Sequence, residues 1–453
     1  MNNGITVLLA CVLVLGSELT TSRPRVVRLT DLSGAVEASV AINPTNPDNI
    51  VVVSMAKPPG GTPRVTNYAY VTTDGGHTWK TVANPNPELR VQGDDAITFN
   101  SEGVAYRSYI SFDGLYVQRP ARALNGIFVC ASTDGGLTWK EPVTVVDHKN
   151  TVSPFEDKPY LVVDNAPTSP HKHNVYIAWT RFDVYGSADP EHKSHIYFSR
   201  STDGGKTFAV PIRISDTGGD CLDSDNTVEG AVPAVGLNGE VYVVWSGPLG
   251  LVFDKSLDGG LTFGKDTTIS PHPGGWDISI AGINRHNGMP VTGVDHSGGP
   301  YRGSLYVNWI DQRHGDPDVF IMYSRDGGAT WSKPVRVNDD PIGNRKEQFF
   351  TWMAVDPADG SINVVFYDRR DTTDTLTRLT LARSIDGGQT FVNHPINQPA
   401  FSCSPNIFFG DYTGIAARNG LVVPVFMHFV NATEVTLSAA LFRFKPGTQQ
   451  LIN

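Results

Sequence analysis

The chain of 453 residues has a formal net charge of −10, with 40% hydrophobic and 18% charged residues. This negative charge argues against nucleic acid or an anionic membrane as the main partner. The 45 glycines and 31 prolines indicate many turns. Together with the short runs rich in Val, Tyr and Trp that lie between them, they predict an all-β protein.

The N-terminus has the pattern of an export signal. An apolar run from Val7 to Gly16 is followed by small and polar residues up to Ser22, which offers cleavage points. The run departs from the usual pattern because no Lys or Arg precedes it. We therefore expect a signal peptide over residues 1–22 and a secreted or periplasmic protein. No other stretch is long and apolar enough to predict a membrane span.

Six copies of one short motif follow along the chain. Each has Ser or Thr, then Asp-Gly-Gly, then Thr and an aromatic residue, and the aspartates recur every 55 to 69 residues. Glycines supply positive φ and the Asp can accept turn N–H groups, so each copy predicts a hairpin turn. A turn repeated at this period indicates a repeat architecture. The copies are Thr72–Trp79, Ser132–Trp139, Ser201–Phe208, Ser256–Phe263, Ser324–Trp331 and Ser384–Phe391.

This motif resembles the Asp-box, or BNR repeat, of the sialidase-like β-propellers. The resemblance implies a ring of four-stranded blades in which the box joins the third strand to the fourth. It also implies that the box aspartates are structural. Asp-boxes occur in propellers with different activities, so the resemblance implies the fold more strongly than the function.

The number of blades follows from the two ends of the chain. After the last box we expect three strands, over 412–417, 421–426 and 436–444, and no fourth. The segment Arg25–Asp31 matches the fourth-strand pattern of Val335–Asp339. We therefore predict a single domain, residues 23–453, that forms a seven-bladed propeller closed by its N-terminal strand, with six blades as the alternative. Closure removes exposed sheet edges.

Ionisable residues gather where each first strand begins and each second strand ends. In a propeller these loops share the face opposite the Asp-boxes, at the mouth of the central channel. Here Asp and Arg side chains either pair and hold blades together, or act on a ligand. The resemblance to sialidases, which bind a carboxylate with three arginines, implies that Arg181, Arg313 and Arg369 converge. Both interpretations stay open.

The resemblance also assigns a role to Tyr412, which lies early in the first strand of the last blade. Sialidase-like enzymes use a nucleophilic Tyr on an inner strand, paired with a Glu base. It implies Glu229 or Glu156 as the base and Asp95 or Asp157 as the general acid/base, with Asp411 contacting substrate. The alternative is a core Tyr that packs between blades. The family's Arg-Ile-Pro motif is absent, since Ser22 to Arg25 does not match it.

No cofactor is expected, although one loop has the composition of a calcium site. Asp220, Asp223 and Asp225 lie close together, and Ca²⁺ prefers such oxygen ligands; the alternative is a solvated acidic loop. No His or Cys spacing resembles a zinc site. Cys130 is expected as a buried thiol, whereas Cys221 and Cys403 could be free or paired.

Three functions remain open from the sequence. The first is a secreted sialidase-like glycoside hydrolase that acts on a terminal, acidic sugar. The second is a non-catalytic propeller that binds glycan or protein on the same face. The third is a polysaccharide lyase acting on uronic-acid polymers, which also needs a cation beside the carboxylate. In the first case the partner is a carbohydrate substrate, and a monomer is expected.

Overall fold

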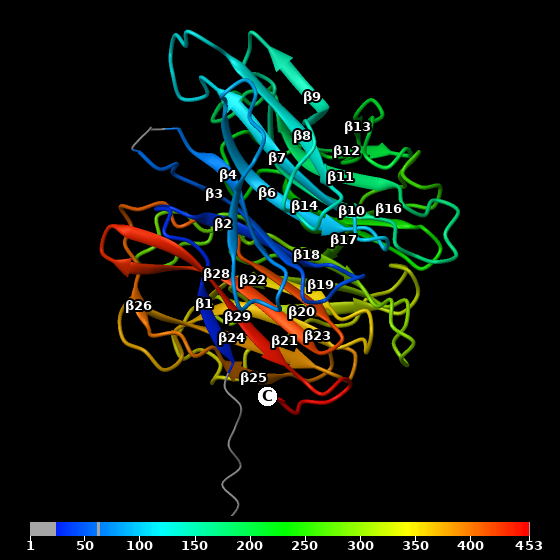
Figure 1. Ribbon diagram of the computed structural model, residues 1–453, viewed down its shortest axis with the longest axis vertical. Helices are drawn as coiled ribbons and strands as arrows, with labels where there is room; N and C mark the ends of the chain where they lie inside the picture. The colour runs from blue at the N-terminus through cyan, green and yellow to red at the C-terminus, as the bar shows by residue number, and fades with distance from the viewer. Residues whose placement is uncertain (1–23, 61–63, 453) are drawn as a thin grey trace, which may run out of the picture.

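The computed structural model describes residues 24–60 and 64–452, and the expected signal peptide lies outside this part of the chain. Its regular elements are β-strands, arranged in seven antiparallel sheets (Figure 1). The first strands of successive sheets contact one another, from β2 through β6, β10, β14, β18 and β22 to β27, and β27 returns to β2. The ring is therefore closed, and the fold is the predicted seven-bladed β-propeller.

Four strands form each blade, in chain order from the channel outward. Blades 1 to 3 consist of β2 (Val36–Ile42), β3 (Ile50–Ala56), β4 (Thr66–Thr72) and β5 (Lys80–Ala83); β6 (Val91–Phe99), β7 (Ala105–Asp113), β8 (Leu124–Ser132) and β9 (Val143–Lys149); and β10 (Phe155–Val163), β11 (Val175–Phe182), β12 (Ser194–Ser201) and β13 (Ile212–Arg213).

The next three blades repeat this order, and the sixth has one extra short strand, which pairs with β24. They consist of β14 (Glu229–Val235), β15 (Val241–Gly247), β16 (Gly250–Ser256) and β17 (Thr267–Ser270); β18 (Val291–Val294), β19 (Leu305–Asp311), β20 (Asp318–Ser324) and β21 (Val335–Arg336); and β22 (Gln348–Val355), β23 (Ile362–Asp368), β24 (Leu376–Ser384) and β25 (Val392–Pro395), with β26 (Phe401–Ser402).

The seventh blade joins the two ends of the chain. It contains β27 (Gly414–Arg418), β28 (Leu421–Asn431), β29 (Glu434–Arg443) and, as its fourth strand, β1 (Arg25–Arg28), which pairs antiparallel with β29 (Figure 1). The predicted closing strand is confirmed, although it is shorter than Arg25–Asp31. Because the third and fourth strands come from opposite ends of the chain, no hairpin links them. This explains why seven blades carry only six Asp-boxes.

The Asp-boxes lie at the opposite face from the beginnings of the first strands, as expected. In the fifth box the Ser324 hydroxyl donates to Asp326 at 2.7 Å, and the Thr330 hydroxyl donates at 2.6 Å. Hydrogen bonds from Thr330 and then Ser324 lower the pKa of Asp326 to about 2. Gly328, with φ of 83°, lies so close to the neighbouring blade that a Cβ would meet the Phe253 ring at 2.5 Å. The box therefore closes its own turn and packs against the preceding blade.

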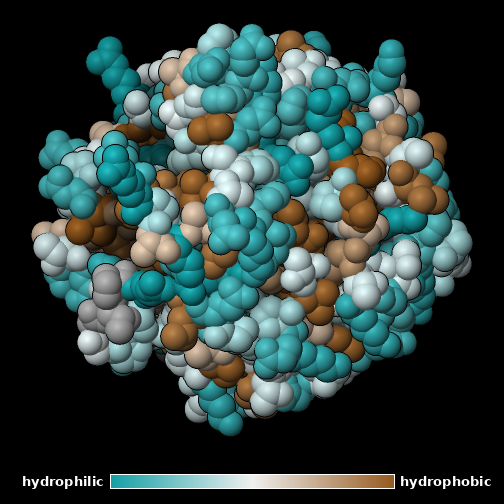
Figure 2. All heavy atoms as spheres, turned by 90° about the horizontal axis from the view of Figure 1, so that it is seen from above, coloured by the Kyte–Doolittle hydropathy of each residue, from teal (hydrophilic) through white to brown (hydrophobic). Residues whose placement is uncertain are grey.

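Hydrophobic side chains fill the spaces between blades and much of the channel. Trp179, Trp245 and Trp309 come from the second strands of blades 3, 4 and 5 and are fully buried. On the face in Figure 2, hydrophobic side chains are scattered among hydrophilic ones. Among the residues described, no helix is long and apolar enough to cross a membrane.

The cysteines in the described part of the chain are free and buried. Cys130 is the buried thiol that the sequence predicts. Cys221 and Cys403 are not joined, which decides the pairing that the sequence left open. The fold therefore depends on packing and ring closure rather than on a disulfide between these loops.

Candidate active site

The inner strands of five blades share an irregularity that brings ionisable side chains to the channel mouth. The pairing of the first and second strands shifts register in blades 1, 2, 3, 4 and 6. At each shift one residue has a left-handed backbone, and such bulges re-aim a side chain. These residues are Glu37 (φ 57°), Asp94 (48°), Lys158 (48°), Gly230 (79°) and Phe350 (46°).

Three of these bulge residues line one cavity. Glu37, Asp94 and Lys158 all contribute to a cavity of about 230 Å³ on the face where the first strands begin. A left-handed conformation costs a residue with a side chain about 1–3 kcal/mol, and such strain clusters at functional sites. The wall also includes Asp157, Arg285 and a set of aromatic side chains: Phe112, Tyr116, Phe155, Tyr185 and Phe408.

Lys158 is a buried cation surrounded by carboxylates. Its ammonium lies 2.9 Å from Glu229 Oε1, 3.2 Å from Asp411 Oδ2 and 3.4 Å from Asp157 Oδ2. Burial alone would lower the pKa of Lys158, but Asp157, Glu229 and Asp411 raise it well above its usual value. Lys158 therefore stays charged and holds carboxylates from three blades together.

A second cation, Arg285, comes from the long loop between β17 and β18. Its guanidinium binds Asp411, with Nε 2.8 Å from Oδ1, and Asp223, with NH1 2.9 Å from Oδ2. Trp276 of the same loop donates its indole N–H to Asp223 at 2.8 Å. Its ring lies over Gly230, where a Cβ would meet it at 2.6 Å. The glycine in the fourth bulge thus leaves room for this loop to reach the mouth of the channel.

The carboxyl groups of this cluster differ in ionisation. Burial, and then the neighbouring Asp411, raise the pKa of Glu37 to about 8. Burial, and then Glu37, also raise the pKa of Asp94 well above its usual value. Burial acts on Asp223 too, but Lys158 and Arg285 outweigh it and lower its pKa to about 2. The cluster therefore holds protonated and ionised carboxyls together at neutral pH, which is the arrangement that acid/base chemistry requires.

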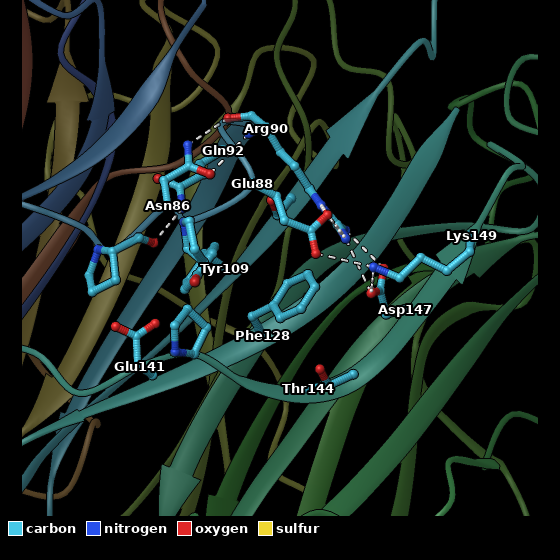
Figure 3. Close-up of a pocket in the computed structure, with 14 residues that line it drawn as sticks. Asn86, Glu88, Arg90, Gln92, Tyr109, Phe128, Glu141, Thr144, Asp147 and Lys149 are labelled. Carbon is cyan, nitrogen blue, oxygen red and sulfur yellow. Dashed lines mark hydrogen bonds and ion pairs between the residues drawn. The ribbon is translucent and has the colours of Figure 1, made fainter. Parts of the chain in front are cut away.

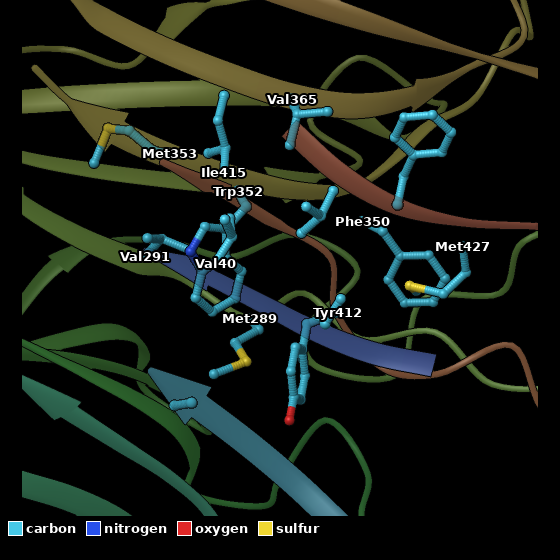
Figure 4. Close-up of a cluster of buried hydrophobic side chains, with 14 of the residues drawn as sticks. Val40, Met289, Val291, Phe350, Trp352, Met353, Val365, Tyr412, Ile415 and Met427 are labelled. Atoms are coloured by element: carbon cyan, nitrogen blue, oxygen red, sulfur yellow. The ribbon is translucent and has the colours of Figure 1, made fainter. Parts of the chain in front are cut away.

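Tyr412 lies among aromatic side chains in the channel. Its ring centroid is 5.5 Å from that of Tyr160 and 5.9 Å from that of Trp352, which are themselves 4.9 Å apart. Figure 4 shows Tyr412 beside Met289, with its hydroxyl pointing out of the apolar cluster. That hydroxyl donates to Asp94 Oδ1 at 3.4 Å. Burial, and then Asp94, raise the pKa of Tyr412 well above its usual value, whereas a nucleophile needs a lowered pKa or an adjacent base.

The two bases suggested for Tyr412 have other partners. Glu229 pairs with Lys158, as described above. Glu156 accepts the Trp179 indole N–H at 2.5 Å and pairs with Arg181 at 2.7 Å. Of the two suggested general acid/bases, Asp157 lines the cavity, whereas Asp95 is fully buried against Arg107 at 2.6 Å. The structure therefore brings Asp157, Glu229, Asp411 and Tyr412 to the central cluster and leaves Glu156 and Asp95 within their own blades.

The three arginines expected to converge are dispersed. Arg181 pairs with Glu156, Arg313 with Asp311, and Arg369 with Glu347, each within its own blade. Arg369 also donates to the carbonyl of Ala281 at 2.8 Å and so braces the loop that carries Arg285. The structural interpretation of these Asp/Glu–Arg pairs is the one that the contacts support, since each guanidinium already binds a carboxylate.

The three aspartates of the loop that resembles a calcium site have separate hydrogen-bond partners. Asp223 belongs to the central cluster, while Asp220 accepts hydrogen bonds from Thr227 and Ser224 at 2.7 and 3.0 Å. Asp225 accepts the backbone N–H of Asp277 at 2.8 Å. In the described part of the chain no group of three or more His, Cys, Asp or Glu side chains is arranged to hold a metal ion. The expectation of no cofactor, with a structural calcium as the alternative, stays a prediction.

A second cavity, of about 270 Å³, lies beside β8 and β9 of the second blade (Figure 3). Four of its charged side chains pair with one another: Arg90 pairs with Asp147 at 2.8 Å and with Glu88 at 2.7 Å, and Lys149 pairs with Asp147 at 2.6 Å. Because these charges already have partners, this cavity is a weaker candidate than the one at the channel mouth.

Sequence reasoning gave no role to Lys158, Glu37 and Arg285. Lys158 directly follows the candidate Asp157 in the sequence, whereas Glu37 and Arg285 belong to no motif. Aligning the repeats on their first strands could have found Glu37, Asp94 and Lys158. All three align with Gly230, and a glycine at that position indicates a left-handed backbone. Arg285 gives no such signal, since it lies in the long loop before β18 and has no counterpart in the first strands of the other repeats.

Comparison with known proteins agrees with the fold. The model of the BNR/Asp-box repeat matches residues 322–333. No curated protein matches the chain. A crystal structure of a protein of unknown function from Dyadobacter fermentans is similar, with 12% identity over 94% of this chain and 98% of that one and a TM-score of 0.52.

Two further solved structures are carbohydrate-active enzymes. The GH93 α-L-arabinofuranosidase of Fusarium graminearum, in complex with arabinobiose, has 13% identity over 93% of this chain and 98% of that one, with a TM-score of 0.51. A PL25 ulvan lyase, bound to a glucuronic acid–sulfated rhamnose unit, has 13% identity over 91% and 95%, with a TM-score of 0.50. At these identities the likeness shows the fold alone.

The repeats, the ring and these likenesses define the class of protein. The chain is a seven-bladed β-propeller of the BNR/Asp-box type. Propellers of similar fold include glycoside hydrolases and a polysaccharide lyase.

Proposed function

We propose that the protein is a glycoside hydrolase whose reaction takes place in the cavity at the channel mouth. The observation that carries this proposal is the set of three ionisable side chains, Glu37, Asp94 and Lys158, held on left-handed bulges around one cavity. The fold is shared with carbohydrate-active enzymes, which supports a glycan as the substrate.

Two carboxyl groups of the cavity suit the roles that glycoside hydrolysis needs. Glu37 keeps its proton up to about pH 8 and donates it to the leaving glycosidic oxygen. Asp157, 3.4 Å from the Lys158 ammonium, is the second carboxyl group, and it acts as the nucleophile on the anomeric carbon or as the base that activates a water. A bond forms to the anomeric carbon, either from Asp157 or from the water that gives a proton to Asp157, as the bond to the leaving oxygen breaks and that oxygen takes the proton from Glu37.

The charge of the cluster favours a neutral sugar over an acidic one. Six carboxyl groups, from Glu37, Asp94, Asp157, Asp223, Glu229 and Asp411, surround two cations. Both cations, Lys158 and Arg285, already bind carboxylates, so neither offers a free partner to a substrate carboxylate. A sugar carboxylate would therefore lie among these carboxyl groups, three of which already have raised pKa values, without a free cation to pair with. The acidic substrate suggested by the sialidase resemblance is therefore replaced by a neutral one.

The test compares Glu37→Gln and Asp157→Asn with Asp183→Asn, an exposed aspartate that follows β11 on the same face. Nitrophenyl glycosides of neutral and of carboxylated sugars are assayed, and the absorbance of unsaturated products reports lyase activity. We expect hydrolysis of a neutral glycoside, with turnover reduced about 10²–10⁴-fold in Glu37→Gln and unchanged in Asp183→Asn. Unchanged turnover in both cavity variants would contradict the assignment, unsaturated products would favour the lyase, and binding without turnover would favour the non-catalytic alternative.

A further inference from the structure

One side of the cavity is an aromatic wall that the proposed chemistry does not use. Tyr185 packs against Phe155 and Phe182, with ring centroids 5.4 and 5.0 Å apart, and its hydroxyl donates to Asp223 at 3.1 Å. Its position is thus fixed from two directions. Tyr116 continues the wall outward, 6.4 Å from Tyr185 and nearly perpendicular to it.

Tyr116 is unusual because it lines the cavity and yet is 78% exposed. Leaving a large aromatic ring in water forgoes the free energy that its burial would provide. A single exposed apolar residue is common on protein surfaces, but this one adjoins a cavity and a second, rigid aromatic ring. The ring therefore has the position of a contact surface for whatever occupies the cavity.

The loop that presents Tyr116 is braced at both ends. The backbone N–H of Val117 donates to the carbonyl of Gly114 at 3.2 Å. Gly114 has φ of 86°, and a Cβ there would meet Pro120 at 2.6 Å, so the turn requires glycine. Arg122 pairs with Asp113 and donates to the carbonyl of Glu88 at 2.8 Å. The exposed ring is thus carried by a defined turn.

We propose that Tyr116, with Tyr185 behind it, is a second sugar-binding subsite that stacks on the apolar face of a neutral sugar residue next to the one held by the carboxyls. The ligand class is a neutral oligosaccharide of at least two residues. Aromatic rings suit this role because they offer a large, rigid and apolar surface with little loss of rotamer entropy. This inference rests on the proposed hydrolase, and it makes Tyr116 a residue that determines substrate length.

The experiment uses Tyr116→Ala, with Tyr116→Phe and Val117→Ala as matched controls. Val117 is the exposed neighbour on the same loop and is absent from the cavity wall. Binding is measured calorimetrically in the Asp157→Asn background with trisaccharides of arabinose, galactose, glucose and xylose. Turnover of these trisaccharides and of the matching nitrophenyl monosaccharides is measured in the otherwise wild-type protein.

We expect Tyr116→Ala to weaken binding and raise KM about tenfold for a trisaccharide, with no change for the nitrophenyl monosaccharide. Both controls should behave as the parent protein does. Equal affinity in Tyr116→Ala would overturn the subsite, as would an equal loss for both substrates.

The outcomes separate the two proposals. Trisaccharide binding that depends on Tyr116, without hydrolysis, would leave the subsite standing and contradict the hydrolase. Trisaccharide hydrolysis that is unchanged in Tyr116→Ala would contradict the subsite and leave the hydrolase standing. A protein that binds none of the trisaccharides and cleaves none of the glycosides would contradict both.

Discussion

The two faces of the propeller place acidic side chains in opposite physical situations. On one face the Asp-box carboxylates are exposed or half-buried and accept hydrogen bonds from Ser and Thr residues no more than four positions away, as at Asp326. On the other face Glu37 and Asp94 are buried among carboxyls from other blades, and their pKa values are raised.

The same chemical group therefore stabilises a turn in its ionised form on one face and is held protonated on the other. The difference comes from where the hydrogen-bond donors are. In the boxes they are supplied by the local sequence, so the charged form is stabilised. At the channel mouth the neighbours are mainly other acids, brought there by the ring, so the protonated form is favoured.

Removing Lys158, one of the two cations of the acidic cluster, should have the largest effect on stability. In Lys158→Met, three carboxylates lose their shared partner, and breaking such a buried arrangement costs about 3–5 kcal/mol. Thermal and urea unfolding measure this loss. Lys255→Met is the control on the Asp-box face, because Lys255 donates to the carbonyl of Gly327 instead. Equal, small losses in both variants would contradict the difference between the faces.

The second largest effect that we expect is on the pH dependence of stability, which should differ between the two faces. Folded Glu37 keeps its proton to about pH 8, whereas in the unfolded chain it is released near its ordinary value of 4.5. Its contribution to stability is therefore full below about pH 4.5 and is lost as the pH rises through about 8. For the same reason kcat/KM should fall about tenfold per pH unit above about 8. A melting temperature that falls equally between pH 4.5 and 8 in Glu37→Gln and in the wild type would show that Glu37 is not the titrating group.

The corresponding change in a box should cost less and leave the chemistry alone. Asp134 accepts the Ser132 hydroxyl at 2.8 Å and the backbone N–H of Thr138 at 2.9 Å. Because the turn is exposed, water can replace some of these contacts, and we expect Asp134→Ala to destabilise by about 1 kcal/mol. Activity measured well below the unfolding temperature should equal that of the wild type. A selective loss of turnover in a fully stable variant would be inconsistent with a structural box.

Tyr412→Phe should have the smallest effect and decides the remaining question about this residue. The ring keeps its packing against Tyr160 and Trp352, and only a long hydrogen bond to Asp94 is lost, which costs less than about 1 kcal/mol. If Glu37 and Asp157 carry the reaction, turnover should change little. A fall of several orders of magnitude with an unchanged melting temperature would instead support the nucleophile suggested by the sialidase resemblance.

Much of the fold could be predicted because its signals are local and repeated. The six boxes give the period, and the missing fourth strand after residue 444 points to Arg25–Asp31. The site was predicted only in part. Asp157, Glu229, Asp411 and Tyr412 were placed correctly at the channel mouth, since they precede or begin first strands. The arginines at the ends of second strands were also located there, but their own blades already neutralise them.

The turns, the blade count and the closure of the ring follow from the sequence alone, because each depends on residues a few positions apart or on a pattern that recurs. The contacts of the central side chains depend instead on how the ring brings distant residues together. Arg285 and Asp411, 126 positions apart, meet across the mouth of the channel, and Tyr412 meets Tyr160 and Trp352 from other blades. The left-handed bulges at Glu37, Asp94 and Lys158 are marked in the sequence only by their alignment with Gly230, because the ring stabilises a conformation that these residues by themselves disfavour.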